Sequence, residues 1–192
     1  THNQMIGTKN CCVYTQIDTG GNVWAAMPMT LEGSKILVYP FIWDYYVKMY
    51  KQTWGVDFPF APAKDELWVM ADFAKDHWEG FPEKSITDFK MRDGAFIDLT
   101  LNYYGDKAKD IKVTIEGKTY DAIEIVTHFT IKGSSRIEGK NYTFDVENVQ
   151  KFVYAYKAGP VGYKQLPFMI DYGFGPFPVP GEEWATQRFN VK

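Results

Sequence analysis

A change in hydrophobic period near Pro82 constrains the fold of this chain more than any other feature. Beyond that residue, apolar side chains recur at every second position, which is the spacing of a β-strand with one buried face. The clearest run is Ala95, Ile97, Leu99, Leu101 and Tyr103, and shorter runs follow over residues 111–115, 123–132, 142–146 and 152–157. Turn residues separate the runs about every 8–12 positions, so we predict a mainly β (α+β) fold, an antiparallel meander of about eight to ten strands that forms a barrel or a sandwich.

Glycine marks the expected hairpins. Residues 12–18 and 22–29 read as a first hairpin around Gly20-Gly21, and a short strand follows over residues 35–39. The sequence Ile115-Glu116-Gly117-Lys118 recurs as Ile137-Glu138-Gly139-Lys140, with a looser copy at residues 31–35. Because each copy places glycine between two extended runs, we interpret all three as hairpin turns.

Two segments after the first strands show helical spacing, and we expect two inserted helices. Ile42, Tyr45, Tyr46, Met49 and Tyr50 form one stripe, and Gly55 follows it. The second helix is expected over residues 64–78, with Gly80 just beyond its end. The last segment, residues 159–192, is rich in Pro, Gly and aromatic residues, and we expect a long ordered loop there. The length of 192 residues suits a single domain, residues 1–192.

The aromatic content is high, at 17% of the chain. Part of it falls on strands, where core packing explains it, and part lies in connectors and in the expected helices. Tyrosine and tryptophan combine an apolar ring with a polar edge, which suits sugars and flat ligands. The candidate ligand-binding residues from this second group are Trp43, Tyr46, Trp54, Tyr172 and Phe174.

His128 is the strongest candidate for acid–base chemistry. It shares one face of its expected strand with Glu124, Thr130 and Lys132, because alternate residues project to the same side. If that face lines an interior, these groups provide candidate catalytic residues. If it faces water, they are cross-strand solubilising residues. Both interpretations remain open at this point.

A short segment carries a resemblance to a known family. Residues 154–159, Tyr-Ala-Tyr-Lys-Ala-Gly, followed by Tyr163-Lys164-Gln165, resemble a strand of the alginate-lyase jelly rolls over about twelve residues. The resemblance implies that Tyr163 assists β-elimination. Asp18 stands where that family has its catalytic histidine, and the family's Arg-x-Glu-Leu-Arg strand is absent, so the chain is not assigned to the family.

Other classes of function find no support in the sequence. The net charge of −3 gives no electrostatic footprint for nucleic acid. No nucleotide-binding or metalloprotease motif occurs, and we expect no cofactor and no metal site. Four carboxylates, Asp65, Asp72, Asp76 and Glu79, are expected on a solvated helix face. Cys11 and Cys12 are adjacent, so we expect one buried and one partly exposed thiol, with an intermolecular or strained vicinal disulfide as the alternative.

Three functions remain from this reasoning. The leading hypothesis is an extracytoplasmic binding protein with an aromatic-lined site for a carbohydrate or a small hydrophobic ligand. The alternatives are an acid–base enzyme such as a polysaccharide lyase, and a structural or assembly subunit. We expect a small-molecule or glycan partner, no membrane span, and a homo-oligomer or protein partner as a further option. The start Thr1-His2-Asn3-Gln4 suits a processed secreted or periplasmic protein, although any truncated start would look the same.

Overall fold

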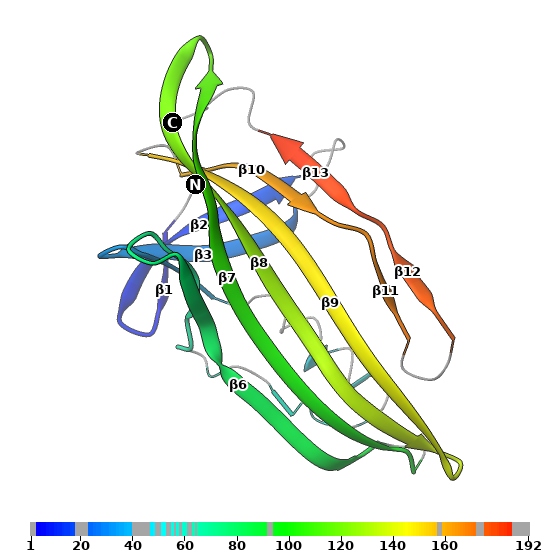
Figure 1. Cartoon of the computed structure of the whole chain (residues 1–192). Coiled ribbons are helices and arrows are strands. Elements are labelled where there is room, and N and C mark those ends of the chain that lie inside the picture. Colours follow the sequence, from blue (N-terminus) through cyan, green and yellow to red (C-terminus); the bar gives the residue numbers. More distant parts are fainter. Residues whose placement is uncertain are drawn as a thin grey trace.

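The protein forms two antiparallel sheets whose strands follow one another in chain order (Figure 1). The computed structural model describes residues 3–17, 23–39, 47–48, 51–52, 55, 57, 59–60, 63, 65–91, 94–156, 159–171 and 175–185. The first sheet contains β1 (Asn3–Ile6), β2 (Lys9–Ile17), β3 (Val23–Glu32), β4 (Lys35–Val38) and β5 (Trp68–Asp72), in that order. The expected meander of the first strands is thereby confirmed.

The second sheet is built on three very long strands that cross in front of the first sheet in Figure 1. Its members in spatial order are β13 (Glu182–Ala185), β10 (Gly159–Gln165), β9 (Lys140–Ala155), β8 (Lys118–Ile137), β7 (Phe96–Ile115) and β6 (His77–Lys90). β7 and β8 each have 20 residues and pair along almost their whole length. The sequence analysis divided β7 and β9 into two shorter strands each, which was wrong, and it placed only residues 123–132 in the strand that is β8.

The repeated Glu-Gly sequences form hairpin turns, as predicted. Glu116 and Gly117 join β7 to β8, and Glu138 and Gly139 join β8 to β9, with positive φ at all four residues. Two consecutive positive φ values give the turn a twist that matches the flanking strands. The third copy also forms a tight turn, at Gly33-Ser34 between β3 and β4.

The core lies between the two sheets, so the architecture is a sandwich. One cluster of buried side chains takes Ile36, Val38, Trp68 and Met70 from the first sheet and Trp78, Leu101, Ile125, Phe152 and Tyr154 from the second. Within the described part of the chain the strands divide into separate sheets and do not form a closed barrel. The barrel alternative is therefore wrong, and the sandwich alternative fits.

The helix expected over residues 64–78 is wrong. Residues Trp68–Asp72 form β5, and His77 begins β6. A buried strand carries apolar residues on both faces, and the turn after it interrupts the alternation of a strand. The apolar residues of the strand and the turn therefore recur at a spacing close to that of a helix. Asp72 caps this turn, because its Oδ1 accepts hydrogen bonds from Ser34 Oγ at 2.7 Å and from the Ala74 amide at 3.2 Å. The carboxylates between Asp65 and Glu79 therefore do not share a helix face.

The first expected helix, over residues 42–50, falls mostly outside the described residues. Val47, Lys48, Lys51 and Gln52 have helical geometry. No helix in the described part of the chain has the length and the hydropathy needed to cross a bilayer.

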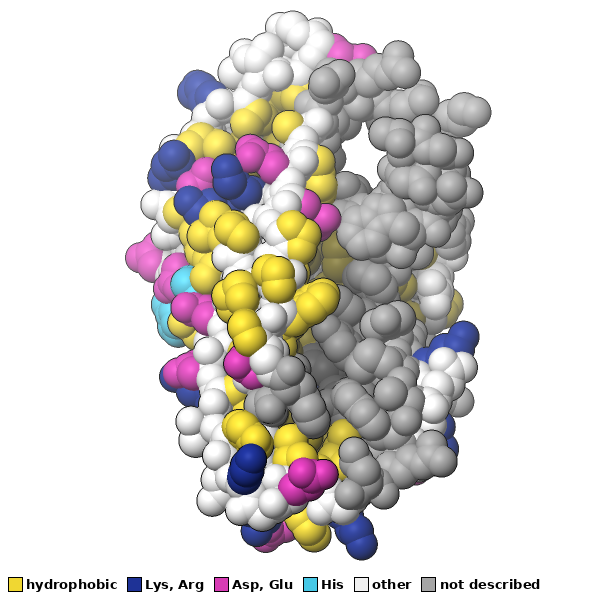
Figure 2. All heavy atoms as spheres, turned by 90° about the vertical axis from the view of Figure 1, so that its right-hand side faces the viewer, with side chains coloured by type: hydrophobic (Ala, Val, Ile, Leu, Met, Phe, Trp, Pro, Cys, Tyr) yellow, Lys and Arg dark blue, Asp and Glu magenta, His cyan; other side chains and the backbone are white. Residues whose placement is uncertain are grey.

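The C-terminal segment is not the long loop that we expected. It supplies β10 and β13 to the second sheet, and between them β11 (Phe168–Ile170) pairs with β12 (Phe177–Val179). Its glycines and prolines fall largely between these short strands, where turn chemistry is needed. The right-hand side of the molecule, where β11 and β12 lie, carries exposed hydrophobic side chains (Figure 2), among them Met169 and Phe177.

Candidate functional site

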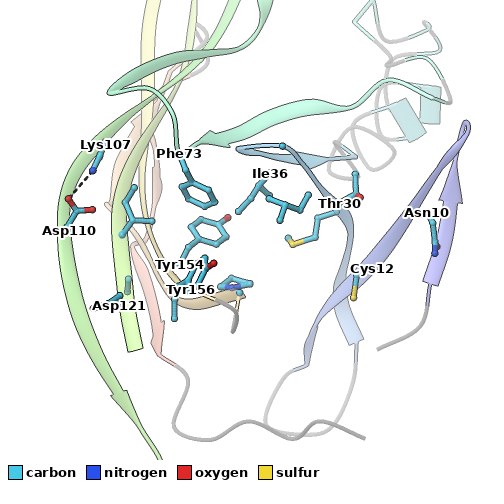
Figure 3. Close-up of a pocket in the computed structure, with 18 of the residues that line it drawn as sticks. Asn10, Cys12, Thr30, Ile36, Phe73, Lys107, Asp110, Asp121, Tyr154 and Tyr156 are labelled. Atoms are coloured by element: carbon cyan, nitrogen blue, oxygen red, sulfur yellow. Dashed lines mark ion pairs between the residues drawn. The ribbon is translucent and has the colours of Figure 1, made fainter. Parts of the chain in front are cut away.

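A cavity of about 930 Å³ lies between the two sheets, where the end of the β7–β8 hairpin passes the first strands (Figure 3). β7, β8 and β9 provide one wall, and β1 to β4 provide the other. The volume is in the range of small-molecule sites, which are concave and mostly apolar with a few polar groups. The cavity is the candidate functional site of this protein.

The wall from the first sheet follows from strand register. Cys12 on β2 pairs with Met29 on β3, and Leu31 pairs with Ile36 on β4. Paired residues of an antiparallel sheet project to the same side, so these four side chains face the cavity together. Ile36 is buried, whereas Leu31 is exposed at the rim.

Three aromatic rings gather in the middle of the cavity in Figure 3. Phe73, in the turn after β5, meets Tyr154 of β9 edge to face, with ring centroids 6.1 Å apart and ring planes at 69°. The Tyr154 hydroxyl donates to Met70 Sδ at 3.0 Å, which holds the ring in position. Tyr156 follows two residues later and is 71% exposed, while Tyr154 is buried. The cavity therefore has a deep aromatic ring and an accessible one.

Charged and polar groups line the cavity near the β7–β8 hairpin and along β1 and β2. Lys107 and Asp110 on β7 form an ion pair of 3.0 Å. Asp121 on β8 lies 3.5 Å from Lys112, and its carbonyl accepts the Tyr156 amide at 2.8 Å. Asn3 and Asn10 contribute neutral polar groups from the opposite wall. This distribution suits a ligand with an apolar body and a polar group.

The two cysteines project to opposite sides of β2, as expected. Both are free thiols; Cys11 is buried and Cys12 is exposed and lines the cavity. Burial raises the pKa of the Cys11 thiol, and the positive charge of Lys9 opposes this in part. Cys12 is therefore the accessible thiol of the pair.

His128 lies on the outer face of the second sheet, away from the cavity. Its ring stacks on Tyr104 with centroids 4.7 Å apart and planes at 5°. Its Nδ1 contacts Glu147 Oε1 at 2.7 Å, and its Nε2 lies 3.9 Å from Asp106 Oδ2. Asp106 in turn contacts His77 Nδ1 at 2.8 Å. These contacts link four adjacent strands across the outer face. Desolvation, together with the charges of Glu147 and Asp106, raises the pKa of Tyr104.

The four candidate catalytic residues do not meet at one place. Glu124, His128 and Lys132 share a face of β8, but each is four residues from the next, which is about 13 Å along a strand. Glu124 lies 3.8 Å from Lys109, and Lys132 lies 3.1 Å from Asp145. Their catalytic role stays a prediction.

Tyr163 is buried on the inner side of the second sheet, with its ring 5.0 Å from Phe152 and 6.0 Å from Trp184. Its hydroxyl donates to Gln165 Oε1 at 3.3 Å. Desolvation, with the nearby Glu182 carboxylate, raises the pKa of Tyr163. The side chain of Tyr163 and that of His128 are therefore on opposite faces of the sheet, and one reacting group cannot contact both.

The five candidate ligand-binding residues, Trp43, Tyr46, Trp54, Tyr172 and Phe174, lie outside the described residues. Sequence reasoning missed the aromatic residues that line the cavity as ligand contacts. Tyr154 and Tyr156 have the i, i+2 spacing that places two rings on one side of a strand, and this was the available signal. Phe73 gave no such signal, because it was assigned to a helix.

No group of three or more metal-ligating side chains occurs among the residues that the structure describes. Comparison with known proteins found no matching family model, no matching curated protein and no matching solved structure.

Proposed function

We propose that this protein binds a small, largely apolar ligand in the cavity between its two sheets. The observation that carries the proposal is a volume of about 930 Å³ with aliphatic side chains on both walls and three aromatic rings, those of Phe73, Tyr154 and Tyr156. Apolar surface of this kind favours a ligand by removing its apolar area from water. A carbohydrate is less well matched, because its hydroxyl groups need many polar partners when they are buried. The extracellular or periplasmic location stays a prediction.

Exposed apolar side chains at the rim support an opening to solvent. Leu31 and Phe73 are 67% and 38% exposed, although both line the cavity. Exposed large apolar residues that border a concavity are typical of ligand-binding grooves. A ligand can enter beside them without unfolding either sheet.

Titration with the apolar fluorophore N-phenyl-1-naphthylamine tests the proposal. We expect saturable binding of one molecule per chain. Phe73→Ala should weaken it at least tenfold, since it removes an aromatic wall. Phe177→Ala is the matched control, because Phe177 is an exposed phenylalanine on β12 that does not line the cavity. Absence of saturable binding, or equal loss in both variants, would reject the proposal.

A protein contact at the β11–β12 hairpin is a second candidate function. Its support is the exposure of Met169 on β11 and of its partner Pro178 on β12, two apolar side chains that project to the same face of the hairpin. Sedimentation velocity at rising concentration tests it. Association that Met169→Ser abolishes would favour this function, and a monomer at all concentrations would count against self-association.

A further inference from the structure

We propose that the ligand of the cavity is an organic cation, an amine or quaternary ammonium group attached to an apolar body. This inference rests on the proposed function and adds the chemical class of the ligand. Two features of the lining carry it: the arrangement of the aromatic rings and the balance of charge.

The aromatic rings offer faces to a cation. The ring planes of Phe73 and Tyr154 are inclined at 69°, and both rings line the cavity, with Phe73 partly exposed and Tyr154 buried. Tyr156, two residues after Tyr154 and largely exposed, lies beside them in the cavity (Figure 3). The face of an aromatic ring is electron-rich and attracts ammonium groups within about 6 Å, and sets of such rings recognise quaternary ammonium ligands.

The charged groups of the lining favour the same class. Asp110 and Asp121 are carboxylates, and Lys107 is the single cation among the described lining residues. Lys107 is already paired with Asp110 at 3.0 Å. Asp121 lies 3.5 Å from Lys112, which does not line the cavity, so the described lining itself carries two carboxylates and one ammonium group, and its charge favours a cation over an anion. The net charge of −3 over the whole chain also favours approach of a cation.

The apolar part of the lining determines the chemical character of the rest of the ligand. Met29, Ile36 and Ile123 surround the rings and carry no polar side-chain group that a sugar could use. A bare inorganic cation would leave this surface in contact with water. The combination of a cationic head with an alkyl or aryl body uses both parts of the cavity.

Competition between three ligands that share one octyl chain tests the inference. Octyltrimethylammonium, 1-octanol and octyl sulfate are used below their aggregation limits to displace N-phenyl-1-naphthylamine from the intact protein. We expect the ammonium compound to bind roughly tenfold more tightly than the alcohol, and the sulfate to bind most weakly. Alcohol or sulfate binding as tightly as ammonium overturns the inference.

Two carboxylates supply matched variants. Asp121→Asn should reduce the preference for ammonium over octanol about threefold, a modest change because the group is exposed. Asp145→Asn removes a similar exposed carboxylate, also paired with a lysine, that does not line the cavity, and it should leave the preference unchanged. Equal effects of the two variants overturn the assignment to Asp121. If the fluorophore itself does not bind, the proposed function fails as well; if it binds and all three ligands compete equally, only the cationic class fails.

Discussion

Phe73 meets Tyr154 edge to face, with ring centroids 6.1 Å apart, and this contact joins the turn after β5 to the last part of β9. The two residues are 81 positions apart in the sequence, and they bring together the segment that connects the two sheets and a central strand of the second sheet. The cavity is therefore bordered by a contact that contributes to folding as well as to the candidate site.

Replacing Phe73 by leucine should lower the free energy of unfolding by about 0.5–1.5 kcal/mol, because leucine keeps most of the apolar volume but loses the edge-to-face contact. Urea unfolding measures this change. Phe177→Leu, at an exposed position without that partner, should leave stability nearly unchanged. A loss of equal size in both variants would show that the ring contact has no specific effect.

A substitution in a hairpin turn should raise the stability of the protein. Glu138 has φ of 50°, a conformation that costs energy for most side chains but that asparagine adopts readily. Glu138→Asn should therefore stabilise the protein by about 0.5–1 kcal/mol. Glu138→Gln removes the same charge without the conformational benefit and should have little effect on the melting temperature. Equal stabilisation by glutamine and asparagine would point to charge as the cause.

Alkaline pH should destabilise the protein through Tyr103. Burial raises the pKa of this tyrosine from 10.0 to about 12, with the Thr127 hydroxyl opposing the shift in part. Between these values the unfolded chain releases its proton first, so stability present below pH 10 is lost as the pH rises towards 12. The loss is about 2–3 kcal/mol for this group. Unfolding measured from pH 9 to 12 should show a smaller loss in Tyr103→Phe, and the same loss as wild type in Tyr156→Phe.

Acid should destabilise the protein through Asp72. The Ser34 hydroxyl, with the Ala74 amide, holds the pKa of this carboxyl below its usual value of 3.8. The stabilisation is therefore complete above the usual value and is lost as the pH falls through the lowered one. Ser34→Ala should make unfolding less dependent on pH below 4. An unchanged pH profile in that variant would show that the hydrogen bond does not control the titration.

The outer-face contacts of His128 should affect stability without affecting ligand binding. His128→Ala removes contacts with Tyr104 and Glu147 and should cost about 1 kcal/mol, since the groups are partly exposed. The affinity for N-phenyl-1-naphthylamine should not change, because His128 does not line the cavity. A large fall in affinity would show that the outer face takes part in binding.

The hairpins could be predicted from the sequence because Glu-Gly between alternating runs leaves few conformations other than a tight turn. The length of β7 could not, because Gly105 looks like a point where a strand ends. In the structure the strand continues there, since the indole of Trp78 lies against the glycine and a Cβ atom would come within 2.2 Å of it. Glycine at this position serves a close approach between side chain and backbone, a tertiary requirement that local sequence does not express.

The aromatic ligand site stays a prediction, because its five residues lie outside the described part of the chain. Phe73 and Tyr156 line the cavity, but they were assigned to a helix and to a strand and were not predicted as ligand contacts. Which residues line the cavity depends on how the two sheets stack, because Tyr156 and Cys12 are 144 positions apart and line it from opposite walls. Alternation correctly placed His128 and Lys132 on one face of β8, but alternation alone cannot distinguish an inner face from an outer one.

The accessible thiol of Cys12 provides the most direct test of the ligand site, because it lines the cavity while Cys11 is buried on the other side of the strand. Alkylation by iodoacetamide, followed by intact mass, should give one adduct on the native protein and none in Cys12→Ser. Saturating N-phenyl-1-naphthylamine should slow the formation of that adduct at least tenfold. An alkylation rate that is the same with and without the bound fluorophore would show that the ligand does not occupy this cavity.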